Sequence, residues 1–209
     1  MINDCDTFES PILPAILPMD YYDSDQVFDS YFPDQAQRVS EIHWTPLAMA
    51  KEAASFLSAV PGSKILDIGS GIGKFCIAGG HFFPDSEFHG VEQRMDLVEV
   101  AIRAKRRSMV DNVHFMHANF TQLSLNGYEG IYFYNSFAEN LSSLSRIDEA
   151  IEYSYSLYEY YSNFLYNKLS KVAKGTRLAT YYGDENDVPT NFELVGQHPQ
   201  KPLKMWICK

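Results

Sequence analysis

The chain has 209 residues, 45% of them hydrophobic and 21% charged, which suits one globular domain or one domain with an extra arm. Its formal net charge of −10 disfavours nucleic acid as a partner, because binding along a phosphate backbone requires a basic surface. No apolar run approaches the roughly 20 residues that cross a bilayer, and residues 1–6 carry acids where a signal peptide carries bases. We therefore expect a cytoplasmic protein without a membrane segment. The three cysteines are far apart and form no Cys-x-x-Cys pair, which indicates reduced thiols and no metal site.

The N-terminal fifth differs in charge from the rest of the chain. Residues 1–41 hold nine acids and one base, Arg38, and prolines interrupt any long helix. Five aromatic residues between 21 and 32 argue against a fully disordered tail. We expect an acidic, aromatic arm over residues 1–40 that closes over the mouth of the site as a lid, followed by the main domain over residues 41–209.

The main domain begins with a predicted helix, for which Thr45 is the expected cap and Pro46 a first-turn residue. Beyond it, short apolar runs alternate with amphipathic segments. Strands are predicted over residues 64–68, 87–91, 113–117, 130–134, 176–182, 192–196 and 204–207, and helices over 73–83, 94–109 and 147–175. This alternation predicts an α/β fold: a doubly wound, mostly parallel seven-stranded sheet with a C-terminal antiparallel hairpin, plus the N-terminal arm.

A glycine-rich loop connects the first predicted strand to the helix that follows. Its sequence from residue 67 is Asp-Ile-Gly-Ser-Gly-Ile-Gly. Glycines allow a sharp turn and a close approach of backbone N–H groups to a ligand, and ligands of open α/β sheets bind beyond the carboxyl ends of the strands. An acid, Glu92, ends the second strand, where a carboxylate can accept both hydroxyls of a ribose. A Walker phosphate loop does not fit, because Phe75 follows Lys74, and Lys74 also stands where a nicotinamide-binding loop has Gly or Ala.

These motifs resemble those of class I S-adenosylmethionine-dependent methyltransferases over residues 45–209. The resemblance implies that the loop binds the cofactor through Asp67, Gly69, Ser70, Gly71 and Gly73. It implies that Glu92 binds the ribose, that Asn119 meets the adenine amino group and that Phe120 packs on the ring. Tyr134 and Asn135 stand where the family places residues that face the transferred methyl group, Asn135 also touching the cofactor.

The resemblance implies methyl transfer by in-line displacement, with S-adenosylmethionine as cofactor and adenosylhomocysteine as product. Positioning and exclusion of water supply most of such an acceleration, so the chain needs no nucleophile triad. Tyr134, Asn135 and Glu139 are the candidate catalytic residues, with Glu139 either balancing an ammonium, taking a proton or capping a following helix. Residues 135–137, Asn-Ser-Phe, resemble the Asn-rich segment of non-SET lysine methyltransferases, which favours a small-molecule or protein amine as acceptor. A non-catalytic cofactor-binding interaction protein and an NAD-dependent oxidoreductase remain the alternatives.

Overall fold

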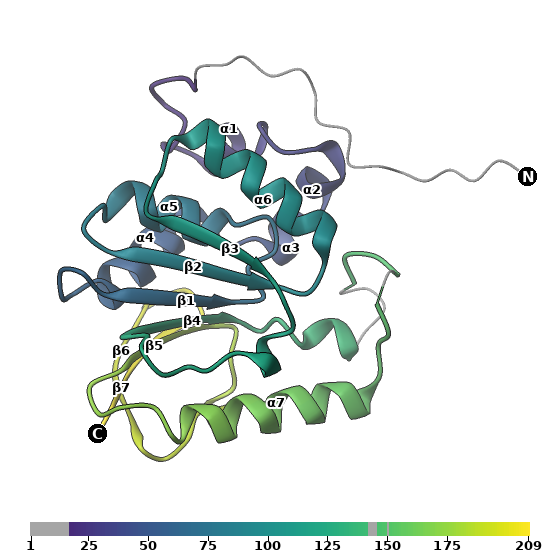
Figure 1. Ribbon diagram of the computed structural model, residues 1–209. Helices are drawn as coiled ribbons and strands as arrows, with labels where there is room; N and C mark the ends of the chain where they lie inside the picture. Colours follow the sequence, from purple (N-terminus) through teal and green to yellow (C-terminus); the bar gives the residue numbers. More distant parts are fainter. Residues whose placement is uncertain (1–16, 142–145, 150) are drawn as a thin grey trace, which may run out of the picture.

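A computed structural model describes residues 17–141, 146–149 and 151–209 and shows a single seven-stranded sheet with helices on both faces (Figure 1). The strand order is β3-β2-β1-β4-β5-β7-β6. The strands are β1 (Lys64–Ile68), β2 (Glu87–Glu92), β3 (Val113–His117), β4 (Gly130–Tyr134), β5 (Arg177–Tyr181), β6 (Phe192–Gln197) and β7 (Leu203–Cys208). The first five are parallel, and β6 and β7 form the antiparallel hairpin that the sequence predicted. No helix within the described ranges is long and apolar enough to cross a membrane.

The chain changes direction across the sheet next to the glycine loop. It moves outward from β1 to β2 and β3, then returns to the other side of β1 as β4. Loops at the carboxyl ends of β1 and β4 therefore diverge from one another, and such a switch point leaves a crevice in which ligands bind.

Two layers of helices cover the sheet. The helices are α1 (Asp25–Asp29), α2 (Asp34–Arg38), α3 (Ser40–His43), α4 (Leu47–Leu57), α5 (Lys74–Phe82), α6 (Met95–Ser108) and α7 (Tyr155–Leu169), with 3-10 turns η1 (Phe120–Gln122), η2 (Ala138–Asn140) and η4 (Glu185–Asp187). Figure 1 shows α5 and α6 above the sheet with the N-terminal helices, and α7 below it. Side chains of β1 alternate between the two layers: Ile65 joins the core under α4 and α5, whereas Leu66 and Ile68 join the core under α7.

The N-terminal segment, residues 17–46 before α4, packs into the same core as the rest of the chain. Tyr21, Phe28 and Phe32 are at most 2% exposed and lie in one cluster with residues of α4 and α5. The aromatic residues of the predicted arm therefore contribute to folding, and residues 1–16 of that arm lie outside the described ranges. Its division from the domain at residue 40 remains a prediction.

The start of α4 differs from the expectation. The helix begins at Leu47, and Thr45 does not cap it, because the Thr45 hydroxyl lies 2.9 Å from the Tyr132 hydroxyl. The Leu47 N–H instead donates to Asp25 Oδ1 at 2.8 Å. A carboxylate from the N-terminal segment thus takes the role of the cap.

The helix predicted over residues 147–175 was also wrong at both ends, since α7 covers only Tyr155–Leu169. Helix α7 begins at Tyr155, and Ser154 caps it by accepting from the Leu157 N–H at 3.2 Å. The apolar spacing that suggested an earlier start comes from Ile147 and Ile151, which line a cavity instead of a helix face. Residues 142–145 and 150 lie outside the described ranges.

Candidate functional site

The glycine loop lies between β1 and α5 in a conformation that depends on its glycines. Gly69, Gly71 and Gly73 have φ of 74°, 53° and 81°, a region that other residues rarely adopt. A Cβ at Gly69 would lie 2.5 Å from Ser136 Oγ, and one at Gly71 would lie 2.5 Å from Trp44 Cζ3. The loop is therefore packed tightly by the β4 end on one side and by the N-terminal segment on the other.

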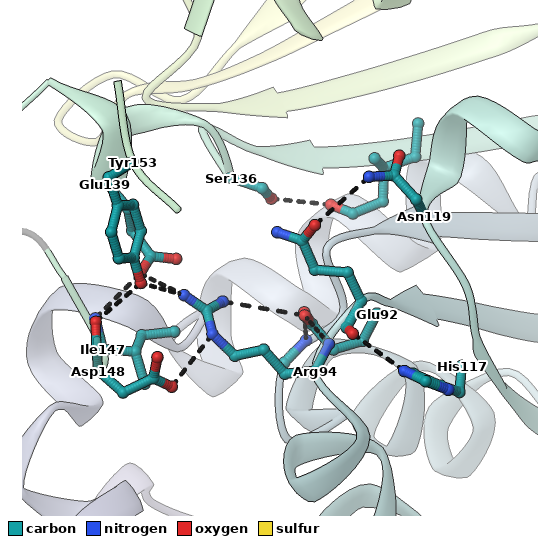
Figure 2. Close-up of polar contacts among 12 residues, drawn as sticks. Glu92, Arg94, His117, Asn119, Ser136, Glu139, Ile147, Asp148 and Tyr153 are labelled. Atoms are coloured by element: carbon teal, nitrogen blue, oxygen red, sulfur yellow. Dashed lines mark hydrogen bonds and ion pairs between the residues drawn. The ribbon is translucent and has the colours of Figure 1, made fainter. Parts of the chain in front are cut away.

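Glu92 connects this loop to the next strand. Its side chain is 5% exposed, with Oε2 accepting from the Gly71 N–H at 3.1 Å and Oε1 accepting from the Arg94 N–H at 2.9 Å (Figure 2). Burial raises the pKa of the Glu92 carboxyl, and the Arg94 N–H and guanidinium oppose that rise. Each carboxylate oxygen can accept more than one hydrogen bond, so Glu92 retains capacity for ligand hydroxyls.

Asp67, near the end of β1, is buried, and its side chain meets no strong donor within the described part of the chain. Its Oδ2 lies 3.5 Å from Cys76 Sγ, a weak hydrogen-bond donor. Burial raises the pKa of Asp67 to about 8, with the nearby Glu92 charge acting in the same direction. Two acids thus face the same space, which favours a ligand that carries positive charge there.

Asn119 and Phe120 follow β3 and line the cavity, but the Asn119 amide is already hydrogen-bonded. Asn119 Oδ1 accepts from the Thr121 N–H at 3.1 Å and its Nδ2 donates to the Tyr161 hydroxyl at 3.0 Å. The amide is therefore engaged in holding η1 against α7. Phe120 is 7% exposed and stacks on Phe137, with ring centroids 5.2 Å apart.

The end of β4 presents Tyr134 and Asn135. The Tyr134 hydroxyl donates to the Ile42 carbonyl at 2.7 Å, which joins β4 to the N-terminal segment. Burial raises the pKa of Tyr134, so the phenol is neutral at physiological pH. Asn135 has φ of 32°, an uncommon conformation for a residue other than glycine, and such strain is frequently found at functional sites.

Arg94 forms a buried cluster that the sequence did not predict. Its guanidinium Nη2 donates to Glu139 Oε2 at 2.7 Å and to the Tyr153 hydroxyl at 2.6 Å, and Nε pairs with Asp148 at 3.1 Å (Figure 2). The same Glu139 oxygen accepts from the Ile147 N–H at 2.9 Å. Glu139 therefore lies at the site as expected, but it is already held by several donors.

Nearly all the predicted site residues line one cavity of about 410 Å³. They are Asp67, Gly69, Ser70, Gly71, Glu92, Asn119, Phe120, Tyr134, Asn135 and Glu139. Gly73 is not among the lining residues. A Cβ there would lie 2.3 Å from Phe115 Cζ and 3.0 Å from Ala101 Cβ, so this glycine allows α5 to pack closely against β3 and α6. Lining residues that sequence reasoning did not assign include Arg94 and Tyr153.

The ionisable side chains around the cavity are mostly acidic. Its lining includes the acids Glu41, Asp67, Glu92 and Glu139 and the bases Lys74 and Arg94. Lys74 Nζ is itself paired with Asp25 at 2.6 Å and Asp29 at 2.7 Å. Both basic side chains of the lining are thus neutralised by carboxylates, and the cavity suits a cationic or neutral ligand better than an anion.

Residues 59–156 match the family model described as a methyltransferase domain. A tRNA (guanine-N(7)-)-methyltransferase from Synechococcus sp. (strain JA-3-3Ab) is 48% identical over 54 residues, which are 26% of this chain and 23% of that protein. The match thus spans about a quarter of that relative's length.

Two solved structures share the fold. TrmN from Thermus thermophilus has a TM-score of 0.58 at 17% identity, covering 79% of this chain and 49% of that one. Magnesium protoporphyrin IX methyltransferase from Synechocystis PCC 6803, crystallised with bound S-adenosylmethionine, has a TM-score of 0.58 at 14% identity, covering 91% of this chain and 94% of that one.

Proposed function

The chain belongs to the class I S-adenosylmethionine-dependent methyltransferases, and from that premise we propose that it methylates an amine nitrogen of a small molecule or protein bound beside Asn135. The observation that carries the proposal is the cavity at the switch point of the sheet, with its excess of carboxylates. S-adenosylmethionine supplies an activated sulfonium methyl group, so the protein's task is to bind, orient and exclude water.

The residues present fit this cofactor. Glu92 lines the cavity and is our proposed acceptor of the ribose hydroxyls, and Phe120 is the apolar ring proposed for the adenine. Asp67 faces the cavity with one weak thiol contact and no paired cation among the described residues, which suits the positive charges of the methionyl end. We propose that Asn119 contacts the adenine, which requires its amide to exchange the hydrogen bond with the Tyr161 hydroxyl for one with the base.

At the acceptor side, we assign positioning of the nitrogen to Asn135 and Tyr134. The Asn135 side-chain oxygen can accept from an amine and hold its lone pair toward the methyl group. Tyr134 contributes a neutral aromatic wall beside Tyr182, with their ring centroids 5.9 Å apart. Glu139 keeps negative charge near the acceptor, although Arg94 already neutralises part of it.

The N-terminal segment completes the mouth of the cavity in this proposal. Residues 41–44 line it, and Trp44 packs directly on Gly71. Burial lowers the pKa of His43, so its ring stays neutral at pH values somewhat below its ordinary pKa. We propose that the segment covers the bound cofactor as a lid and shields the sulfonium from water.

RNA is the second candidate acceptor, and it conflicts with the charge-based expectation that nucleic acid is disfavoured. It is favoured by the 54-residue match to a tRNA methyltransferase. The paired state of Lys74 and Arg94 argues the other way, because neither basic side chain of the cavity is available for phosphates.

Calorimetric titration with S-adenosylmethionine, adenosylhomocysteine and NAD is the first test. Binding of the first two without NAD supports the proposal, whereas binding of NAD alone returns the oxidoreductase alternative. Transfer of a labelled methyl group is then measured with amine-containing peptides, a small-amine library and bulk tRNA. Glu92→Gln is the binding-deficient control, and Glu87→Gln, at the exposed start of the same strand, is its matched partner. Label in tRNA but in neither amine pool contradicts the proposed acceptor, and label in no pool despite cofactor binding favours the non-catalytic alternative.

A further inference from the structure

Arg94 occupies a position at which an arginine is unfavourable for local structure. It is the N-cap of α6, where Ser, Thr, Asp or Asn would satisfy a free N–H, and its side chain makes no cap bond. A positive charge at a helix N-terminus also opposes the helix dipole. The Arg94 side chain is nevertheless only 4% exposed, so the protein gives up capping stability to place this group in the interior.

The buried guanidinium holds a segment that is distant in sequence. It contacts Asp148 and Tyr153, which lie more than 50 residues after Arg94 in the sequence. Glu139 strengthens the attachment, because the same oxygen that Arg94 binds accepts from the Ile147 N–H and from the Tyr153 hydroxyl. Burial and the Glu139 charge raise the pKa of Tyr153 to about 12, which keeps its hydroxyl a donor.

The segment held in this way forms one side of the cavity. Ile147, Ile151 and Tyr153 line it, and we call these three residues the acceptor wall. Outside the Arg94 contacts, the Ser154 N–H donates to Asn140 Oδ1 at 3.2 Å, which attaches the end of the segment to η2. Figure 2 shows Arg94 pointing from the Glu92 side of the cavity toward Glu139, Asp148 and Tyr153.

The backbone of Arg94 is bound to the carboxylate assigned to the ribose. Its N–H donates to Glu92 Oε1, and its Nη1 lies 3.9 Å from the same oxygen. Ligand hydroxyls that donate to the Glu92 carboxylate would weaken its attraction for the Arg94 guanidinium, for which Glu92 competes with Glu139 and Asp148. Arg94 would then bind Glu139 and Asp148 more firmly.

We propose that Arg94 is a positioning residue that holds the acceptor wall against the ribose carboxylate, so that cofactor occupancy is transmitted to the acceptor side of the cavity. The inference rests on the proposed cofactor site, but not on the identity of the acceptor. It makes the acceptor wall firmest when cofactor is bound.

Hydrogen exchange of the full-length protein tests this coupling, with adenosylhomocysteine as the probe. The reporters are the amides of Ile147 and Ser154, whose acceptors lie on η2. In the wild-type protein, adenosylhomocysteine should slow their exchange on the order of 10-fold, the equivalent of one strengthened hydrogen bond to a charged group. In Arg94→Met the affinity for adenosylhomocysteine should fall by at most the same order of 10-fold, because a coupling between two sites is reciprocal, and that protection should disappear. Arg94→Lys, which keeps the charge but not the forked geometry, should restore part of it.

Arg103→Met is the matched control, because Arg103 lies on the same helix with a 38% exposed side chain. It should behave as the wild type does. If Arg94→Met does not fold, Tyr153→Phe removes one hydroxyl from the cluster and should show the same loss in smaller measure. Protection that persists in the folded variants, or that is lost equally in Arg103→Met, overturns the inference. Loss of adenosylhomocysteine binding in Arg94→Met also overturns it, since Arg94 would then belong to the cofactor site. A wild-type protein that binds no adenosylhomocysteine contradicts the proposed function, whereas binding without protection contradicts the positioning role alone.

Discussion

The contact between Trp44 and Gly71 should be measurable as a coupling energy between the N-terminal segment and the cofactor loop. Trp44 is 6% exposed, and its Nε1 donates to the Ala36 carbonyl at 2.7 Å, so the indole cannot move aside freely. A Cβ at Gly71 would lie 2.5 Å from Cζ3 and 3.1 Å from Cε3 of that ring. Gly71→Ala should therefore destabilise the fold both through its backbone and through the ring.

The magnitude follows from these two contributions. A left-handed conformation costs a residue with a Cβ about 1–2 kcal/mol, and displacing a packed ring costs roughly 1–3 kcal/mol more. Gly175 supplies the control for the first contribution, because its φ is 90° and nothing lies within 4 Å of its Cβ position. Gly175→Ala should therefore be destabilised by the backbone contribution alone.

A double-mutant cycle isolates the second contribution. Trp44→Leu removes the ring atoms that oppose the new Cβ, so Gly71→Ala should cost less in that background by about 1–3 kcal/mol. Urea unfolding of the four proteins gives the cycle, and titration with adenosylhomocysteine shows whether affinity recovers in parallel. Additivity within roughly 0.5 kcal/mol would refute the contact as a source of coupling.

Three further predictions concern single carboxylates and one buried lysine. Glu92→Ala should weaken adenosylhomocysteine binding on the order of 10- to 100-fold in a calorimetric titration, because it removes charged hydrogen-bond acceptors. Unchanged affinity in a folded variant would move the ribose site elsewhere. The pKa of Asp67 is about 8 in the folded protein against 3.8 for the free group, so the folded state binds more protons between these values and stability falls as pH rises from about 4 to 8. Asp67→Asn should remove a slope of up to roughly 1.4 kcal/mol per pH unit in urea unfolding, and identical slopes would contradict the buried, protonated acid. Lys74→Met should cost about 3 kcal/mol, because it leaves the Asp29 carboxylate, 14% exposed, without its ammonium partner, whereas Asp25, 46% exposed, can be hydrated. Lys64→Met, with a 51% exposed side chain, should cost at most about 1 kcal/mol in the same assay.

The sheet could be predicted well because its signals are local. Strands β1, β3 and β4 have the predicted bounds, since each is a short apolar run closed by polar or glycine-rich residues. The glycine loop was predictable because turns with positive φ favour glycine at the position itself, and Glu92 was predictable because it ends a short strand. Chain order then places both at the switch point of the sheet.

Errors arose where a distant residue replaces a local signal. Thr45 has the residue type of a helix cap, but Asp25 caps α4 from 22 positions earlier. Ile147 has helical spacing with later apolar residues, but its N–H is taken by Glu139, and α7 starts only after the Ser154 cap. In both cases a tertiary hydrogen bond outweighed the local preference, which is worth about 1 kcal/mol.

The cofactor side of the cavity is placed by local sequence signals, whereas the acceptor side depends on distant contacts. This difference explains why the cofactor could be predicted while the acceptor remains a proposal. The residues that we assign to the cofactor lie at or just after the ends of β1, β2 and β3, so strand order alone brings them together. The acceptor wall has no such scaffold, because Ile147 and Tyr153 themselves belong to neither a helix nor a strand. Its position depends on a guanidinium at residue 94, and an arginine before a helix has no sequence signature of that task. Acceptor specificity can therefore change through substitutions in this cluster while the cofactor motifs stay the same, so motifs alone identify the chemistry but not the substrate.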